Sequence, residues 1–429
     1  MRTSSVFKRI TFLFIVVPLI VFCAVQLPAQ TIYVKIGGSD ANTGGSWGQA
    51  FATIQKALSV AASGDDIWVA QGTYFPDEGP TQVNNSNLQS FYLKAGVSVF
   101  GGFDGSETNF SQRDPISNIT ILSGEIQNDG DATNNSIHIV TARGMLSDGA
   151  KLNGFLIQDG YANNGGAFSE GAGIRIVSSA GVAVTRCVFL SNYASTLGGA
   201  MAIDSGSTPI INRCDFYNNT VLSLGGGAVV VKEGSSPVFN ACSFRGNFGL
   251  GASVGGGASY ISGSSAFFYS CLFSGNNAHT GGAVFCKNDD PSTFDGCTFS
   301  GNKANASGGA VYNDHTDTEF YNSIFWNNEA SGSTSTSSAV FFNLTSSPQF
   351  GYCLFPVNVT VSGVDLGNNL AADPSFIQGI DPSVSPQLGG DFHLEQCSPV
   401  IDMGDSTNTQ VTLDAGGQDR IVGENIDIG

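Results

Sequence analysis

Carboxyl groups stand close together at residues 289–290 and 314–319 of this 429-residue sequence. Enzymes that cleave polysaccharides need such groups together, either paired for acid–base work or arranged around calcium beside a base. The competing interpretation is a solvated turn of polar residues, which we favour. The candidates for catalytic residues are Asp289, Asp290, Asp314, Asp317 and Glu319.

Two smaller groups of polar residues could bind a ligand. Arg186 and Arg213 occupy equivalent positions 27 residues apart, where stacked guanidinium groups could hold an acidic sugar. Exposure without a role is the alternative. Asn128, Asp129 and Asp131 offer oxygen ligands around a glycine, as in a calcium loop, but the spaced terminal Glu of an EF-hand is missing. We therefore predict no cofactor, although the sequence permits calcium.

A repeat in the middle of the chain must position these groups. Cys (once Ser), Phe and Asn recur in a C-x-F-x-x-N frame every 26–30 residues, and a small-residue triplet such as GGA precedes each copy. A unit this short cannot enclose its own core, so successive units must stack. The copies are CVFLSN (187–192), CDFYNN (214–219), CSFRGN (242–247), CLFSGN (271–276), CTFSGN (297–302), SIFWNN (323–328) and CLFPVN (353–358).

The spacing within the repeat predicts its fold. Alternation along a strand places each Cys and the Phe two residues later on one inward face. Another apolar column lies three residues before each Cys, so a bend must fall between them, where Asn240 and Asp295 stand. A third short strand follows each triplet. The sequence therefore predicts an all-β, right-handed parallel β-helix. Its inward columns are Cys187, Cys214, Cys242, Cys271 and Cys297, and Phe189, Phe216, Phe244, Phe273 and Phe299.

The asparagines of the frame form a third column. Asn tolerates positive φ, and its amide can bond to the next copy in a stack. We expect this column at a corner of the coil, with a left-handed backbone as its first requirement. Its members are Asn192, Asn219, Asn247, Asn276 and Asn302.

The cysteine column is predicted to be a ladder of small, buried hydrophobic side chains. Neighbouring strands lie about 4.8 Å apart, which is within reach of a disulfide, but side chains in one column run parallel. Occasional disulfides in an oxidising compartment are the alternative.

The segments outside the repeat differ in character. Residues 1–29 are typical of a secretory signal, with a basic start, a short apolar run and a small-residue cleavage site. Residues 30–66 contain a strand and an amphipathic helix over 51–62, which we expect to cap the open end of the solenoid. The β-helix is assigned to 67–370, with clear repeats over 149–358, and residues 371–429 form a C-terminal closing segment.

The net charge of −18 excludes nucleic acid and anionic lipid as partners. After the signal, no apolar run is long enough to cross a membrane. We expect a mature chain that is exported and soluble by itself.

The paired GGA and F-x-x-N elements resemble the repeats of the polymorphic outer membrane proteins, a family of bacterial surface β-helix passengers. The resemblance covers about half of the chain, over residues 149–358. It implies a secreted or surface-displayed protein, often adhesive, and offers no catalytic motif. This chain departs from autotransported members because it has no long C-terminal run of amphipathic strands for a membrane barrel.

The leading hypothesis is therefore a non-enzymatic, exported β-helix protein for adhesion or interaction with a surface glycan or protein. It would be extracellular or associated with the bacterial outer membrane. The alternative is a polysaccharide lyase, a hydrolase or a glycan-binding β-helix protein, because parallel β-helices host such enzymes as well.

Overall fold

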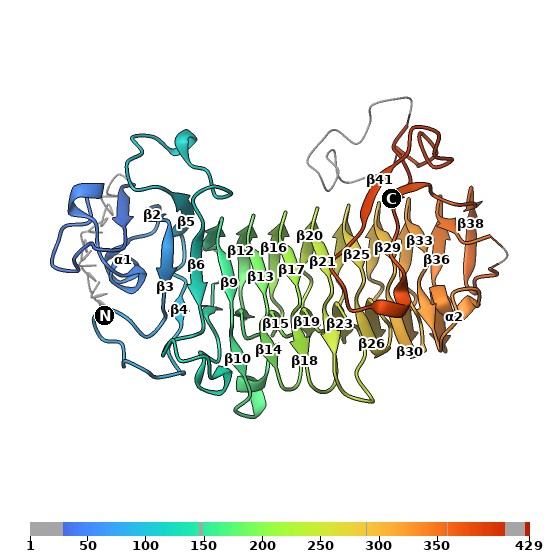
Figure 1. Cartoon of the computed structure of the whole chain (residues 1–429), viewed down its shortest axis with the longest axis horizontal. Coiled ribbons are helices and arrows are strands. Elements are labelled where there is room, and N and C mark those ends of the chain that lie inside the picture. Colours follow the sequence, from blue (N-terminus) through green and yellow to red (C-terminus); the bar gives the residue numbers. More distant parts are fainter. Residues whose placement is uncertain (1–28, 146–148, 289, 358, 408–424) are drawn as a thin grey trace, which may run out of the picture.

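The computed structural model describes residues 29–145, 149–288, 290–357, 359–407 and 425–429. The chain winds into a long coil whose successive turns stack along one axis (Figure 1). In the repeat region each turn supplies one strand to each of four sheets, and every pairing between neighbouring turns in these sheets is parallel. The predicted fold class, a right-handed parallel β-helix, is confirmed.

Two of the four sheets meet at the predicted bend. The 12-stranded sheet contains β1 (Thr31–Val34), β2 (Asp66–Ala70), β5 (Ser98–Phe103), β8 (Lys151–Asn153), β12 (Ala180–Thr185), β16 (Thr208–Asn212), β20 (Val238–Asn240), β24 (Phe267–Tyr269), β28 (Thr293–Asp295), β32 (Glu319–Tyr321), β36 (Gln349–Gly351) and β38 (Val364–Gly367). The 11-stranded sheet contains β3 (Gly72–Tyr74), β6 (Thr120–Ser123), β9 (Leu156–Gln158), β13 (Val188–Leu190), β17 (Asp215–Tyr217), β21 (Ser243–Arg245), β25 (Leu272–Ser274), β29 (Thr298–Ser300), β33 (Ile324–Trp326), β37 (Leu354–Phe355) and β39 (Leu370–Ala371).

The other two sheets complete each turn. The 7-stranded sheet contains β10 (Tyr161–Ala162), β14 (Tyr193–Ala194), β18 (Thr220–Val221), β22 (Phe248–Gly249), β26 (Asn277–Thr280), β30 (Lys303–Ser307) and β34 (Glu329–Ala330). The 9-stranded sheet contains β4 (Phe91–Tyr92), β7 (Val140–Arg143), β11 (Ile174–Val177), β15 (Met201–Asp204), β19 (Val229–Lys232), β23 (Ser259–Ser262), β27 (Val284–Lys287), β31 (Val311–Asp314) and β35 (Phe341–Leu344).

The fourth strand of each turn is an addition to the three predicted from the sequence. It forms the 7-stranded sheet, and several of its members, such as β14 and β18, are only two residues long. A segment this short gives no alternation of apolar and polar residues, so the sequence pattern could not indicate it.

Stacked phenylalanines fill the core along the axis. The rings of Phe244 and Phe273 lie 4.8 Å apart and within 5° of parallel. Phe268, from the apolar column before the bend, meets Phe273 edge-to-face at 5.4 Å. These side chains are fully buried. Burial of each ring stabilises the fold by about 1.5–3 kcal/mol, and each aromatic pair adds about 0.5–1.5 kcal/mol.

The cysteine column is buried as well, but its thiols also donate hydrogen bonds. The Cys271 Sγ lies 3.5 Å from the Phe239 carbonyl oxygen and 3.4 Å from that of Tyr269. Ser323 takes the same place in its turn and donates to the Phe294 and Tyr321 carbonyls, so the position selects a small donor. Disulfides are absent among the described residues. Burial raises the pKa of Cys353 to about 12, which keeps that thiol protonated.

The asparagine column holds the corner by amide chemistry. The Asn276 Oδ1 accepts both the backbone N–H and the side-chain amide of Asn247, each at 3.0 Å. The Asn276 Nδ2 donates to the Phe244 carbonyl and to Asn302 Oδ1, each at 2.9 Å. The same pattern links Asn192, Asn219, Asn247, Asn276, Asn302 and Asn328.

The prediction that the asparagines of this column have a left-handed backbone is wrong by one residue. Positive φ occurs at the preceding position, for example at Asn218 (φ 52) and Gly275 (φ 59), and not at the buried asparagines. The bend before each Cys is displaced by one residue in the opposite direction, since Ala241 and Gly296 carry the positive φ rather than Asn240 and Asp295. The buried side chain and the left-handed turn are therefore separate requirements on adjacent residues.

The N-terminal end of the coil is covered by the predicted helix. α1 (Ile54–Val60) begins after Thr53, whose side chain accepts the Lys56 N–H at 3.2 Å. Ile54, Ala57 and Leu58 are buried against the core, and α1 lies at the end of the coil (Figure 1). The first strand, β1, already pairs with β2, so the solenoid begins before residue 67. The predicted signal, 1–29, lies outside the described residues except for Ala29.

The remaining helices are single turns. They are the helix α2 (Ser337–Val340) and the 3-10 turns η1 (Trp47–Gln49), η2 (Phe110–Gln112), η3 (Ala132–Asn134), η4 (Gly166–Ser169) and η5 (Pro382–Val384). No helix within the described ranges is long and apolar enough to cross a membrane.

Replacing Asn276 tests the amide ladder. Asn276→Ala leaves the Asn247 donors and the Phe244 carbonyl buried without their partner, and each such group costs about 1–3 kcal/mol. We expect a loss of roughly 3 kcal/mol or more in urea unfolding. Asn276→Gly should be no better than Ala, because this φ is negative and Gly adds backbone entropy to the unfolded chain. A smaller loss of stability in Asn276→Gly than in Asn276→Ala would instead support the prediction of a left-handed backbone at Asn276.

Candidate functional site

The closing segment folds back over the turns that precede it. Its antiparallel strands β40 (Phe376–Gln378) and β41 (Asp391–Leu394) pair with each other, and Phe392 of β41 lies 5.7 Å from the guanidinium of Arg245 on β21, so β41 reaches back along the coil (Figure 1). Between them the backbone N–H of Gln387 donates to the Gly275 carbonyl at 3.0 Å, and the Ser385 hydroxyl donates to that of Gly301 at 2.7 Å. The segment therefore runs along the corner between the 11-stranded and 7-stranded sheets.

Glycines stand where this segment crosses the corner. The left-handed position before each Asn is Ser191 and Asn218 in earlier turns and Gly246, Gly275 and Gly301 in three covered turns. In the next turn it is Asn327, whose Nδ2 donates to the Ile380 carbonyl at 2.6 Å. A Cβ at Gly275 would lie 2.4 Å from the Gln387 carbonyl oxygen, and one at Gly301 would lie 2.6 Å from Ile380 Cγ2. These glycines are needed for the close approach of a second chain segment as well as for the turn.

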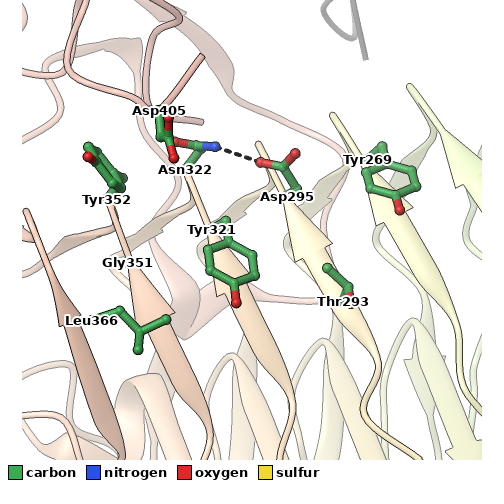
Figure 2. A pocket seen from close by; sticks show the side chains of 9 residues that line it. All are labelled: Tyr269, Thr293, Asp295, Tyr321, Asn322, Gly351, Tyr352, Leu366 and Asp405. Carbon is green, nitrogen blue, oxygen red and sulfur yellow. Dashed lines mark hydrogen bonds between the residues drawn. The ribbon is translucent and has the colours of Figure 1, made fainter. Parts of the chain in front are cut away.

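Asn322 fastens the end of the closing segment to the 12-stranded sheet. Its Oδ1 accepts the Asp405 backbone N–H at 2.7 Å, and its carbonyl accepts the Gly429 N–H at 2.8 Å. Its Nδ2 donates to Asp295 Oδ1 at 2.7 Å (Figure 2). Asn322 is buried at a left-handed bend, φ 50, so its backbone and its amide are both held in place.

A pocket of about 440 Å³ opens at this junction. Its floor is the outer face of the 12-stranded sheet, and one wall belongs to the closing segment (Figure 2). The lining residues are Tyr269, Thr293, Asp295, Tyr321, Asn322, Gly351, Tyr352, Leu366 and Asp405.

Stacking of turns sets the spacing of the floor. Tyr269, Asp295, Tyr321 and Gly351 are directly paired in register on β24, β28, β32 and β36. Neighbouring strands lie about 4.8 Å apart, so the two tyrosines are separated by roughly 10 Å with Asp295 between them (Figure 2). Gly351 leaves the next place without a side chain, and a Cβ there would lie 3.3 Å from Leu366.

The pocket is acidic and partly shielded from water. Asp295 is buried, whereas Tyr269, Tyr321 and Tyr352 are half-buried. Burial raises the pKa of Tyr269 and, to a smaller degree, so does the Asp295 carboxylate. Burial also raises the pKa of Tyr321, followed by Glu319, Cys353 and Asp295. Both phenols therefore stay protonated at neutral pH and can donate hydrogen bonds.

The acids predicted as catalytic are not gathered into one site. Asp314 lies on the 9-stranded sheet, 2.6 Å from His315 Nδ1 and 3.6 Å from Lys287 Nζ. Asp317 accepts the Ser347 N–H at 2.6 Å in the exposed turn that follows. Asp290 is exposed, and Asp289 lies outside the described residues.

Among the described members of that predicted set, Glu319 lies next to the pocket. It stands on β32, and its Oε2 is 3.3 Å from the hydroxyl of the lining residue Thr293. Its place follows from the repeat, because Thr293 and Glu319 are paired in register on neighbouring strands.

The two predicted arginines lie on adjacent turns at the left-handed bend, with φ of 51 at Arg186 and 52 at Arg213. Arg213 lies two turns and Arg186 three turns before the lining residue Tyr269 along the coil. In the predicted calcium loop, the Asp129 and Asp131 carboxylates accept bonds from Asp131 and Thr133 N–H groups, while Asn128 forms a left-handed turn. The described residues contain no group of three or more His, Cys, Asp or Glu that could hold a metal.

Sequence reasoning missed the pocket, although part of its signal was present. Tyr269, Asp295 and Tyr321 replace the Asn212 and Asn240 of earlier turns in one outward column. Such a change of residue type in an outward column indicates that the surface differs at those turns. The contribution of Asp405 depends on the path of the closing segment, which has no periodic signal.

The parallel β-helix architecture defines the class of protein, and the sequence supports it directly. A family model described as a right-handed β-helix region matches residues 81–266 and 217–371, and the chain belongs to this family. No curated protein sequence matches the chain. The narrower resemblance to polymorphic outer membrane protein repeats stays a prediction.

Several solved structures resemble the chain over most of its length. The pectate lyase Pel9A is 14% identical, with 94% of this chain and 96% of that chain covered and a TM-score of 0.48. A rhamnogalacturonan lyase is 15% identical, with 86% and 97% covered and a TM-score of 0.42. A pectin methylesterase from Aspergillus niger is 12% identical, with 84% and 95% covered and a TM-score of 0.30. At these identities the ligands of those proteins are not transferable.

Substitution of Gly275 tests the docking of the closing segment. Asn is tolerated at this left-handed position in other turns, but in Gly275→Asn its side chain would meet the Gln387 backbone. We expect a loss of about 1–3 kcal/mol in the free energy of unfolding, as for overpacking, with faster proteolysis near residue 387. The control, Asn218→Gly, changes the equivalent uncovered position and should cost only a few tenths of a kcal/mol. Equal behaviour of the two variants would contradict this account.

Proposed function

We propose that this protein is an exported glycan-binding protein and that the pocket at Tyr269, Asp295 and Tyr321 is its binding site. The observation that carries the proposal is the in-register column of two tyrosines with a carboxylate between them. Its volume of about 440 Å³ falls in the range of small-molecule sites, about 300–1,000 Å³.

The lining suits the chemistry of a sugar. The C–H faces of a pyranose pack on aromatic rings, while its hydroxyl groups seek carboxylate, amide and phenol partners. Tyr269, Tyr321 and Tyr352 supply half-buried rings, and Asp295 and Asp405 supply acceptors. The spacing of neighbouring turns is similar to the length of one sugar in an extended chain, so a glycan along the coil axis would present successive rings to successive turns.

Adhesion follows from this site if the glycan belongs to a surface. The secretory signal expected at 1–29 would place the chain outside the cytoplasm, where such glycans are found. The long, rigid coil would hold the pocket away from its point of attachment. Under this proposal the function is binding, and the protein ligand of the earlier hypothesis is replaced by a glycan.

Removal of one ring tests the binding site. Tyr321→Ala should lower the affinity for the preferred oligosaccharide about tenfold, which corresponds to about 1.4 kcal/mol, because the sugar loses a packing face. Isothermal titration with a panel of plant, bacterial and animal oligosaccharides would measure this. The control is Tyr193→Ala, which removes an equally half-buried tyrosine from the distant 7-stranded sheet. Unchanged binding in Tyr321→Ala would refute the assignment of the pocket.

A second candidate function is glycoside hydrolysis. Asp295 and Asp405 line the same pocket from different segments, and a pair of carboxylates across a sugar is the usual arrangement for that reaction. Glu319 lies close by through Thr293.

An activity assay separates the two functions. If the pocket hydrolyses its ligand, reducing ends should accumulate with the wild-type chain. The rate of their formation should be at least a hundredfold lower with Asp295→Asn. The proposal of binding alone expects a stable complex and no new reducing ends. Hydrolysis that persists in Asp295→Asn but disappears in Asp314→Ala would instead favour the site expected from the sequence.

A further inference from the structure

We propose that the binding site extends beyond the pocket to Phe267, so that its ligand is a linear oligosaccharide of at least three sugar units. This inference rests on the proposed glycan-binding function and specifies its ligand class. It adds a residue outside the pocket lining, and it makes the site a short track across β24, β28 and β32 of the 12-stranded sheet.

Phe267 continues the floor of the pocket in two directions. Along β24 it stands two residues before Tyr269, on the same outward face of the strand. Between turns it is paired in register with Thr293 of β28. Because Tyr269 and Thr293 both line the pocket, the surface at Phe267 is continuous with it.

The rings of Phe267 and Tyr269 have nearly the same orientation. Their centroids lie 6.4 Å apart, and their planes are within 13° of parallel. Both side chains are half-buried, whereas Phe268 between them points inward and is fully buried. Figure 2 shows the faces of the Tyr269 and Tyr321 rings turned the same way. Phe267 therefore adds a third apolar ring to the side of the sheet that carries the pocket.

A straight path, inclined to the coil axis, leads from Phe267 to Tyr321. It crosses β28 between Thr293 and Asp295, because the register pairs Phe267 with Thr293 and Tyr321 with Asp295. Strands lie about 4.8 Å apart and alternate residues of a strand about 6.6 Å apart, so the path is roughly 12 Å long. One sugar of an extended chain is similar in length to the spacing of turns. The path therefore exceeds two sugar steps, and a ligand that reaches both ends needs at least three units.

The residues along this path suit a chain of sugars. The outer two sugars would pack their C–H faces on the rings at the ends of the path, and the central sugar would meet polar groups. Those groups are the Asp295 carboxylate and the Thr293 hydroxyl, which lies 3.3 Å from Glu319 Oε2. Because the sugar at Phe267 contacts a residue that the sugar at Tyr321 does not reach, it adds affinity of its own.

Ligand length tests this inference. The probes are cello-, xylo- and galacturono-oligosaccharides of two, three and four units, together with the length series of any other sugar that the oligosaccharide panel detects. Titration into the full chain should show affinity rising roughly tenfold from the two-unit to the three-unit member of the series that binds, with little further gain from the fourth unit. Equal affinity for two and three units would overturn this inference and leave glycan binding intact. Failure of every series and of the panel would overturn the proposed function itself.

Variants of Phe267 locate the source of the gain. Phe267→Ala should reduce the gain from the third unit at least threefold and leave the affinity for the two-unit member as in the wild type. Phe267→Tyr keeps an aromatic ring and should keep the length dependence. The control Phe248→Ala removes a half-buried ring from β22 of the 7-stranded sheet and should change neither affinity. An undiminished gain in Phe267→Ala, or an equal loss for both ligand lengths, would contradict a separate contact at Phe267.

Discussion

In-register pairing of identical residues between turns is the constraint on which the rest of this structure depends. Asparagine stacks on asparagine, and each amide joins its neighbours on both sides while satisfying a buried carbonyl. Phenylalanine stacks on phenylalanine in the adjacent sheet. Because a slip of one residue would turn every inward side chain outward, these columns fix the length of the chain from triplet to corner. Most of the variation in length falls between the Asn corner and the next small-residue triplet, as at residues 248–256.

The outward positions are free to differ once the inward ones are fixed, and the candidate site uses that freedom. Tyr269, Asp295 and Tyr321 are neighbours because the register makes them so, although 26 residues separate each from the next. A site of this kind needs no specialised loop for its floor. The rigid stacking of turns supplies the preorganisation that a binding site otherwise obtains from side-chain packing around it.

The sequence predicted what is periodic and missed what is not. The β-helix, the inward columns and the capping helix follow from residue type and spacing. The exact bends do not, because the left-handed residue in each corner can be Arg, Ala, Ser, Gly or Asn, so no single type marks it. The polar cluster of Asp314, Asp317 and Glu319 was close in sequence, but a corner of the coil divides it between two sheets. Proximity along a solenoid turn is a poor guide to proximity in space.

The path of the closing segment has left a trace in the repeat. On the outer face of the 11-stranded sheet, the residue after each Cys varies between apolar and polar types, as at Val188, Asp215 and Ser243, and it is Ile324 and Leu354 in the last two turns of the repeat. Those two pack with Val400 and Ile428 of the closing segment. Two large outward apolar residues on neighbouring strands would form an exposed patch unless another segment covered them. The same cover brings Asp405 to the pocket through Asn322, so the end of the coil and the wall of the candidate site are made by a single packing arrangement.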